Sequence, residues 1–157
     1  KGGPVMGTWT GIQIILEAGW IPGAMRHNEQ LNFICKDVHI RVESTQSIYT
    51  SSLQKDQLLT IPVSHGEGNY YIDNDGLKEL QDNDQVLFRY VNAQGETTPE
   101  ANINGSIDHI AGITNKHKNV LGMMPHPERA MERLLGKEDG KHIFESILQA
   151  LAIAWAK

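Results

Sequence analysis

Cysteine is nearly absent from this sequence, and the sequence also has neither a basic stripe nor a long apolar run. The 157 residues contain one cysteine, Cys35, which excludes a framework of internal disulfides. The formal net charge is −5, so there is no basic stripe of the kind that binds nucleic acid. The longest apolar stretch, near Ile147–Trp155, is interrupted by Gln149 and is too short to cross a bilayer. We therefore expect a cytoplasmic protein whose partners are small molecules or other proteins, not nucleic acid or a membrane.

The composition predicts a globular domain that contains both strands and helices. Hydrophobic residues make up 39% of the chain and charged residues 21%, which is ordinary for such a domain. The predicted strands are Pro4–Thr8, Asn32–Cys35, Val38–Glu43, Leu59–Val63, Gln85–Val91, Ile110–Thr114 and Val120–Met124. The predicted helices are Gly11–Ala18, Asp75–Gln81 (capped by Asp73 or Asn74) and Gly140–Ala156, with loops at "IPGAMRHNEQ" and "SHGEGN". This mixture favours an α/β layer fold with a mostly parallel sheet and some antiparallel pairing in its second half, where the last two strands form a hairpin.

The segment "PVMGTWTGIQ" has the pattern of a nucleophile elbow, in which a strand turns sharply into a helix. Gly7 and Gly11 lie two residues on either side of Trp9, and such glycines let the strand and the helix approach closely. A Ser or Cys at the tip of such a turn is exposed next to a helix N-terminus, which favours developing negative charge. Trp9 offers only an indole N–H donor and cannot attack a carbonyl carbon. The alternative interpretation of Trp9 is a core aromatic residue beside a glycine-flanked turn.

The segment "MMPHPERA" is the second candidate for chemistry. Pro127 separates His126 from Glu128 and favours an extended path, on which residues i and i+2 face the same side. A carboxylate placed there could hold the imidazole in one tautomer and stabilise its protonated form, as in the base half of a catalytic triad. The alternative is a surface histidine beside a helix-capping glutamate.

Four segments together, "GTWTGIQ", "IPVSHGEGN", "NINGS" and "MMPHPERA", closely resemble one family. It is the glutaminase subunit family of phosphoribosylformylglycinamidine synthase, which belongs to the class I (triad) glutamine amidotransferases of purine biosynthesis. The resemblance extends from Lys1 to about Gln149, and "PGAM" and "NFICK" add to it. It implies a flavodoxin-like amidotransferase fold in which a cysteine at the elbow attacks the side-chain amide of glutamine. The resulting thioester releases ammonia and is then hydrolysed to glutamate.

The resemblance also implies roles for individual residues. Trp9 occupies the position of the nucleophilic cysteine, and His126 and Glu128 fall on the base and its orienting carboxylate. The implied glutamine-binding residues are Gln13, Ser64, His65 and Gly66, with Glu67 and Gly68 completing that signature and Asn104, Gly105 and Ser106 matching a further family segment. Cys35 matches a strand cysteine that is not catalytic, and we expect it to be buried. No metal and no cofactor are expected in this chain.

The departures from the family pattern set the functional hypotheses. The chain begins at Lys1-Gly2-Gly3-Pro4, directly before the elbow strand, so residues 1–157 are expected to be the C-terminal portion of an amidotransferase domain that lacks its N-terminal βα units and their oxyanion loop. The first hypothesis is a glutaminase subunit that supplies ammonia to the large synthetase subunit, which uses ATP, with a small third subunit as a further partner. Because Trp9 replaces the nucleophile, we expect this chain to be inactive as it stands. The second hypothesis is a non-catalytic subunit that docks on the synthetase, and the third is a plain flavodoxin-like ligand-binding domain.

Overall fold

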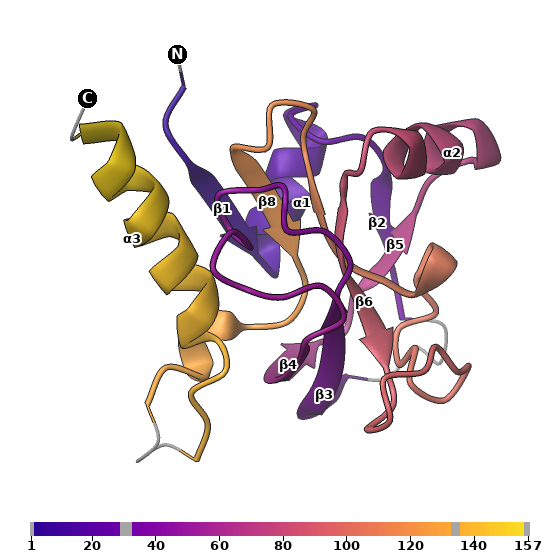
Figure 1. The fold of residues 1–157 in the computed structure, drawn as a ribbon. Coiled ribbons are helices and arrows are strands. Elements are labelled where there is room, and N and C mark those ends of the chain that lie inside the picture. The colour runs from indigo at the N-terminus through magenta and orange to yellow at the C-terminus, as the bar shows by residue number, and fades with distance from the viewer. Residues whose placement is uncertain (1, 29–32, 133–135, 156–157) are drawn as a thin grey trace.

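The structure, a computed structural model, describes residues 2–28, 33–132 and 136–155. Its main sheet has six strands in the order β1-β8-β7-β6-β3-β4 (Figure 1). These are β1 (Val5–Thr8), β3 (Ile34–Val42), β4 (Leu58–His65), β6 (Val86–Val91), β7 (Ile110–Thr114) and β8 (Val120–Met123). A second, two-stranded sheet pairs β2 (Ala24–Arg26) with β5 (Asn69–Tyr71).

In the described part of the chain, three α-helices cover the two faces of the main sheet. Helix α1 (Thr10–Glu17) and helix α2 (Asn74–Asp82) contribute Ile12, Ile15, Leu16 and Leu80 to one buried cluster. Helix α3 (Lys141–Trp155) contributes Ile143 to the other cluster, and it stands beside β1 in Figure 1. Successive residues of β8 alternate between the clusters, with Val120 in the first and Leu121 in the second. The sheet therefore carries a hydrophobic core on each face. Among the described residues, no helix combines the length and the apolar character needed to cross a bilayer.

The pairing of the strands corrects one expectation from the sequence. Among the described strands of the main sheet, only β1 and β8 run parallel, whereas β8–β7, β7–β6, β6–β3 and β3–β4 are all antiparallel. A parallel neighbour needs a crossover connection that carries the chain back along the sheet, usually through a helix. In the described part of the chain α1 follows β1, but β3 leads to β4 and β7 leads to β8 without a helix between them. The prediction of a mostly parallel sheet was therefore wrong for the described strands.

Most predicted elements are present, with differences at the loops. The predicted strands Asn32–Cys35 and Val38–Glu43 form one continuous strand, β3; Asn32 lies outside the described residues. The segment "IPGAMRHNEQ" contains β2, although its last two residues are not described, and "SHGEGN" contains the end of β4 and the start of β5. Asp73 caps α2 as predicted, because its side chain accepts a hydrogen bond from the Gly76 N–H at 2.7 Å. The predicted end of the last helix, Ala156, lies outside the described residues.

Candidate functional site

Trp9 lies at the tip of the turn between β1 and α1, where the sequence pattern placed an elbow. Its backbone has φ 49° and ψ −108°, a region that a bulky side chain rarely enters. The turn is held by the Trp9 N–H, which donates to the Met123 carbonyl of β8 at 3.3 Å. The residue is 41% exposed, so the alternative interpretation of Trp9 as a core aromatic is wrong. The structure therefore has a strained strand-to-helix turn that presents Trp9 at its tip.

Gly7 is what allows the strand and the helix to meet so closely. A Cβ atom added at Gly7 would lie 2.6 Å from the carbonyl carbon of Gly11 and 2.5 Å from Cδ1 of Ile15. At Gly11 itself, an added Cβ atom would meet nothing within 4 Å. The expectation that both glycines serve the close approach holds for Gly7 only.

His126 lies beside Trp9 and is joined to Glu128. The ring centroids of Trp9 and His126 are 6.2 Å apart in an edge-to-face arrangement. On the other side of the imidazole, Nδ1 of His126 is 2.6 Å from Oε1 of Glu128. His126 is only 3% exposed, and its backbone N–H donates to the Pro62 carbonyl of β4 at 2.8 Å. This burial contradicts the alternative of a surface histidine.

The electrostatics of this pair favour a charged carboxylate. Partial burial alone would raise the pKa of the Glu128 carboxyl, but the hydrogen bond and the nearby charge of His126 outweigh it and hold that pKa below its usual range. The second nitrogen of the ring, Nε2, is buried and has no hydrogen-bond partner among the residues that the structure describes. With Nδ1 engaged by Glu128, Nε2 is the atom that remains to exchange a proton with a group at the elbow.

The route by which Glu128 reaches His126 differs from the predicted one. Residues Pro127–Arg129 form a 3-10 turn, closed by the Arg129 N–H to the His126 carbonyl at 3.1 Å, and not an extended segment. The contact expected from the spacing is present, but the geometry assumed for it was wrong. Pro127 fits because it occupies the first helical position, where no N–H is needed.

The segment from Ser64 to Glu67 connects the strand that contacts His126 with the helix that follows Trp9. Ser64 follows two residues after Pro62, whose carbonyl accepts the His126 N–H. At the other end, Glu67 contacts α1, because the amide Nε2 of Gln13 donates to Oε2 of Glu67 at 3.2 Å. His65 ends β4, and Gly66 follows with its carbonyl accepting the Asn28 N–H at 3.1 Å. Gln13 is one helical turn beyond Trp9, so Glu67, which directly follows the candidate glutamine-binding residues, is joined to the helix that begins at the elbow.

The structure also gives Ser106 a task that the sequence did not indicate. Ser106 is buried, and its hydroxyl donates to the Gly68 carbonyl at 3.1 Å while accepting the Tyr70 N–H at 3.2 Å. The amide of Asn102 in turn holds the Ser106 backbone, accepting its N–H at 3.0 Å and donating to its carbonyl at 2.7 Å. The "NINGS" segment therefore braces the loop that carries Gly66, Glu67 and Gly68. A serine two residues after an asparagine gives no such signal in the sequence.

Cys35 differs from its expected environment. It was expected to be a buried packing residue, but its thiol is free and the residue is exposed on β3. At the start of β3, Ile34 is partly buried against the core, whereas Cys35, Lys36 and Asp37 are exposed. No group of three or more His, Cys, Asp or Glu side chains in the described part of the chain is arranged to hold a metal ion.

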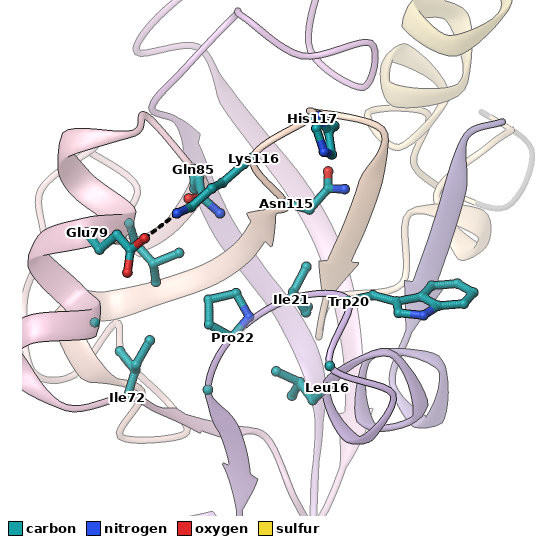
Figure 2. Close-up of a pocket in the computed structure, with 14 residues that line it drawn as sticks. Leu16, Trp20, Ile21, Pro22, Ile72, Glu79, Gln85, Asn115, Lys116 and His117 are labelled. Carbon is teal, nitrogen blue, oxygen red and sulfur yellow. Dashed lines mark hydrogen bonds and ion pairs between the residues drawn. The ribbon is translucent and has the colours of Figure 1, made fainter. Parts of the chain in front are cut away.

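A cavity of about 590 Å³ lies away from Trp9, His126 and the other candidate site residues. Figure 2 shows it between α2, the segment after α1 and the turn between β7 and β8. Lys116 on that turn forms an ion pair with Glu79 on α2, and the indole of Trp20 points away from the other labelled side chains. None of the predicted site residues lines this cavity, so the cavity and the candidate catalytic residues lie in different parts of the molecule. We place the candidate site at the elbow, where the strained backbone and the imidazole–carboxylate pair meet.

Residues 1–145 match the CobB/CobQ-like glutamine amidotransferase domain family. The chain belongs to this family. The resemblance seen in the sequence is thereby confirmed.

The curated relatives are more specific. Over 155 residues the chain is 52% identical to the phosphoribosylformylglycinamidine synthase subunit PurQ of Salinibacter ruber, a match that covers 99% of this chain and 66% of the relative. The PurQ subunit of a Synechocystis species is 54% identical over 142 residues, covering 90% of this chain and 63% of the relative. The chain thus spans a little under two thirds of the length of these relatives.

Solved structures agree with the family. The PurLQS structure from Thermotoga maritima contains a chain that matches with a TM-score of 0.79 and 40% identity, over 94% of this chain and 62% of that one. A further glutamine amidotransferase from Thermotoga maritima matches with a TM-score of 0.54 over 94% of this chain and 61% of that one; at 12% identity it shows the likeness of the fold alone. The fold class expected from the sequence is therefore confirmed at the level of the amidotransferase family.

Proposed function

We propose that this chain is a glutamine amidotransferase subunit of phosphoribosylformylglycinamidine synthase in which Trp9 prevents the hydrolysis of glutamine. The observation that carries the proposal is the placement of Trp9 at the elbow beside a buried imidazole that is held by a carboxylate. The same arrangement with a thiol at position 9 would form a nucleophile–base–orienter triad. The names of its PurQ relatives support glutamine amide transfer in purine biosynthesis as the setting.

In the proposed site each residue has one task. His126 would take the proton from a nucleophile at the elbow through Nε2, since Nδ1 contacts Glu128. Glu128 would orient the ring and stabilise its protonated form. Gln13 and the segment Ser64, His65 and Gly66 would hold the glutamine.

Trp9 removes the first step of that reaction. An indole has no lone pair that can form the covalent intermediate, and its N–H can only donate a hydrogen bond. The side chain also occupies space beside His126, where the carboxamide of the substrate would have to lie. With no thioester, ammonia is not released.

The partner in this proposal is the large synthetase subunit, with a small third subunit as a further candidate. The PurLQS structure from Thermotoga maritima, in which the matching chain was found, supports an assembly of this kind. ATP would be used by the synthetase and not by this chain. A second function is favoured by the loss of the nucleophile alone: a non-catalytic subunit that docks on the synthetase while ammonia comes from solution.

Release of glutamate from glutamine tests the proposal. We expect background rates from the chain as given, with or without a synthetase, and only a small gain from Trp9→Cys. A chimera that joins the upstream segment of a PurQ relative to the Trp9→Cys chain should hydrolyse glutamine, because the oxyanion donors expected upstream are then restored. His126→Ala in that chimera should lower the rate by orders of magnitude. Turnover by the chain with Trp9 in place would contradict the proposal, since another residue would then be the nucleophile.

A further inference from the structure

Glu67 connects three elements of the candidate site through its two carboxylate oxygens. Oε2 accepts the hydrogen bond from the Gln13 amide on α1, at 3.2 Å, and Oε1 lies 3.2 Å from Nδ1 of His27. The side chains of His27 and Glu67 are 72% and 49% exposed, so this contact contributes little to the stability of the fold. An arrangement that stabilises little yet fixes the position of a glutamine-binding residue suggests a role in binding.

A carboxylate decides which way an amide can face. Glu67 can only accept hydrogen bonds when ionised, whereas the Gln13 amide has a donating end and an accepting end. The contact with Glu67 therefore directs the Gln13 NH2 group toward Glu67 and leaves the carbonyl oxygen Oε1 of Gln13 for another partner. That oxygen can receive a hydrogen bond but cannot give one.

The surroundings of Gln13 favour a cationic donor. A cavity of about 270 Å³ is lined by Gln13, Glu67 and Glu17, together with Leu16 and Met25. Two carboxylates at one cavity of this size attract a positive group, and the cavity has room for an amino acid. Of the donors on glutamine, the α-ammonium carries the positive charge.

We propose that Glu67 is a positioning residue that fixes the Gln13 amide so that its Oε1 accepts a hydrogen bond from the α-ammonium group of the bound glutamine. The inference rests on the proposed function, because it assumes that glutamine binds beside Gln13. It adds a residue whose side chain acts through Gln13 and gives His27 the task of holding the second oxygen of Glu67.

Binding of two ligands tests this assignment. The parent for the test is the full 157-residue chain carrying Trp9→Gly, which removes the indole from the site and suits the positive φ at this position. Titration calorimetry with L-glutamine and with glutaramate, which lacks the α-amino group, gives an affinity for each ligand. In Glu67→Gln the new amide can donate to Gln13, so the Gln13 amide is free to reverse. We expect glutamine affinity to fall by about tenfold or more and glutaramate affinity to change by less than about twofold.

Two further variants separate orientation from charge. Glu17→Gln removes the same charge from the same cavity and should lower glutamine affinity by only a small factor. Gln13→Ala should lower it about as much as Glu67→Gln, and the double variant should show no added loss, since both act through one contact. Equal losses for both ligands, or additive losses in the double variant, would overturn the role of Glu67 while leaving the proposed function intact. Absence of glutamine binding by the Trp9→Gly parent would overturn the proposed function and this inference with it.

Discussion

Trp9 keeps a backbone conformation that its side chain does not favour. A φ of 49° in a bulky residue costs about 1–3 kcal/mol, and such conformations persist only where the surrounding structure enforces them. Here the enforcement comes from both sides, through the Trp9 N–H to Met123 and the close approach of Gly7 to Gly11. The turn is thus set by its neighbours and not by the residue at its tip, so a tryptophan can stand where the family resemblance implies a cysteine.

At the same scale, the contact between His126 and Glu128 predicts a dependence of stability on pH. The pKa of Glu128 is lowered in the folded state, so its carboxylate stabilises the fold above the ordinary glutamate pKa of about 4.3 and loses that contribution as the pH falls through the lowered value. Glu128→Gln should therefore destabilise the chain at pH 7, by less than about 1 kcal/mol because the side chain is 45% exposed.

Urea denaturation at about pH 7 and about pH 3 measures this difference. The difference in the free energy of unfolding between the parent and Glu128→Gln should be smaller at the lower pH. Glu100→Gln, at an exposed loop position, serves as the control. If this difference in the free energy of unfolding stays constant or grows on acidification, the contact does not stabilise the ionised carboxylate.

Among the elements, the packing of β1 against α1 gives a matched pair of glycine variants. Gly7→Ala places a methyl group against the Gly11 backbone, which cannot move without shifting the helix, and should destabilise by about 1–3 kcal/mol or more. Gly11→Ala meets open space in a helical residue and should be neutral or stabilising by up to about 1 kcal/mol. The midpoints of urea unfolding compare the two. Equal effects would mean that strand and helix are not in the close contact described.

The brace formed by Ser106 leads to a prediction about the loop before β5. Ser106→Ala leaves the Gly68 carbonyl and the Tyr70 N–H without this partner, at a cost of about 1–3 kcal/mol. Hydrogen exchange should become faster at the amides of residues 66–70 while α3 keeps its protection. Ser51→Ala, at an exposed position, should change hydrogen exchange neither at residues 66–70 nor in α3. Unchanged hydrogen exchange at residues 66–70 in Ser106→Ala would show that the Ser106 hydrogen bonds do not stabilise this loop.

The elements that the sequence predicted well are those in which local patterns decide the structure. The elbow, the helix capped by Asp73 and the β7–β8 hairpin depend on glycine positions, capping chemistry and short connections. The short strands β2 and β5 escaped prediction because each is stabilised by the other, as in the pairing of Ala24 with Tyr71 far along the chain, and not by a local apolar pattern. For the same reason Glu67 and Ser106 received no specific role: their partners are distant in the sequence.

For the whole molecule, the sheet pairing was the main feature that could not be predicted from the sequence. Whether a strand runs parallel or antiparallel depends on the path of the chain between strands, and apolar runs do not encode that path. The contact of Pro62 in β4 with His126 after β8 is of this kind, since it brings an edge strand to the segment that leaves the other side of the sheet. The family resemblance predicted that these segments meet, but the residue patterns alone did not.

The outer edge of β1 predicts self-association of the 157-residue chain. In the described part of the chain β1 pairs only with β8, and the N–H groups of Val5 and Trp9 point toward β8. The alternation of a strand then directs the Met6 N–H outward, where it can pair with another chain. Sedimentation should show a mass that rises with concentration, and Met6→Pro, which lacks the outward N–H, should reduce that rise. A monomer at all concentrations would contradict this prediction.

The most direct test of the whole account asks whether position 9 is built for a nucleophile. In Trp9→Cys the new thiol would lie at the N-terminus of α1 beside His126, an environment that lowers a thiol pKa and raises the thiolate fraction at neutral pH. Cys35, exposed on β3, is the internal reference in the same molecule. The rates of alkylation by iodoacetamide at about pH 7, read by peptide mass spectrometry, should differ by roughly five- to tenfold in favour of position 9. His126→Ala in the same background should remove most of that advantage. A thiol at position 9 that reacts no faster than Cys35 would contradict the assignment of this turn as a nucleophile elbow.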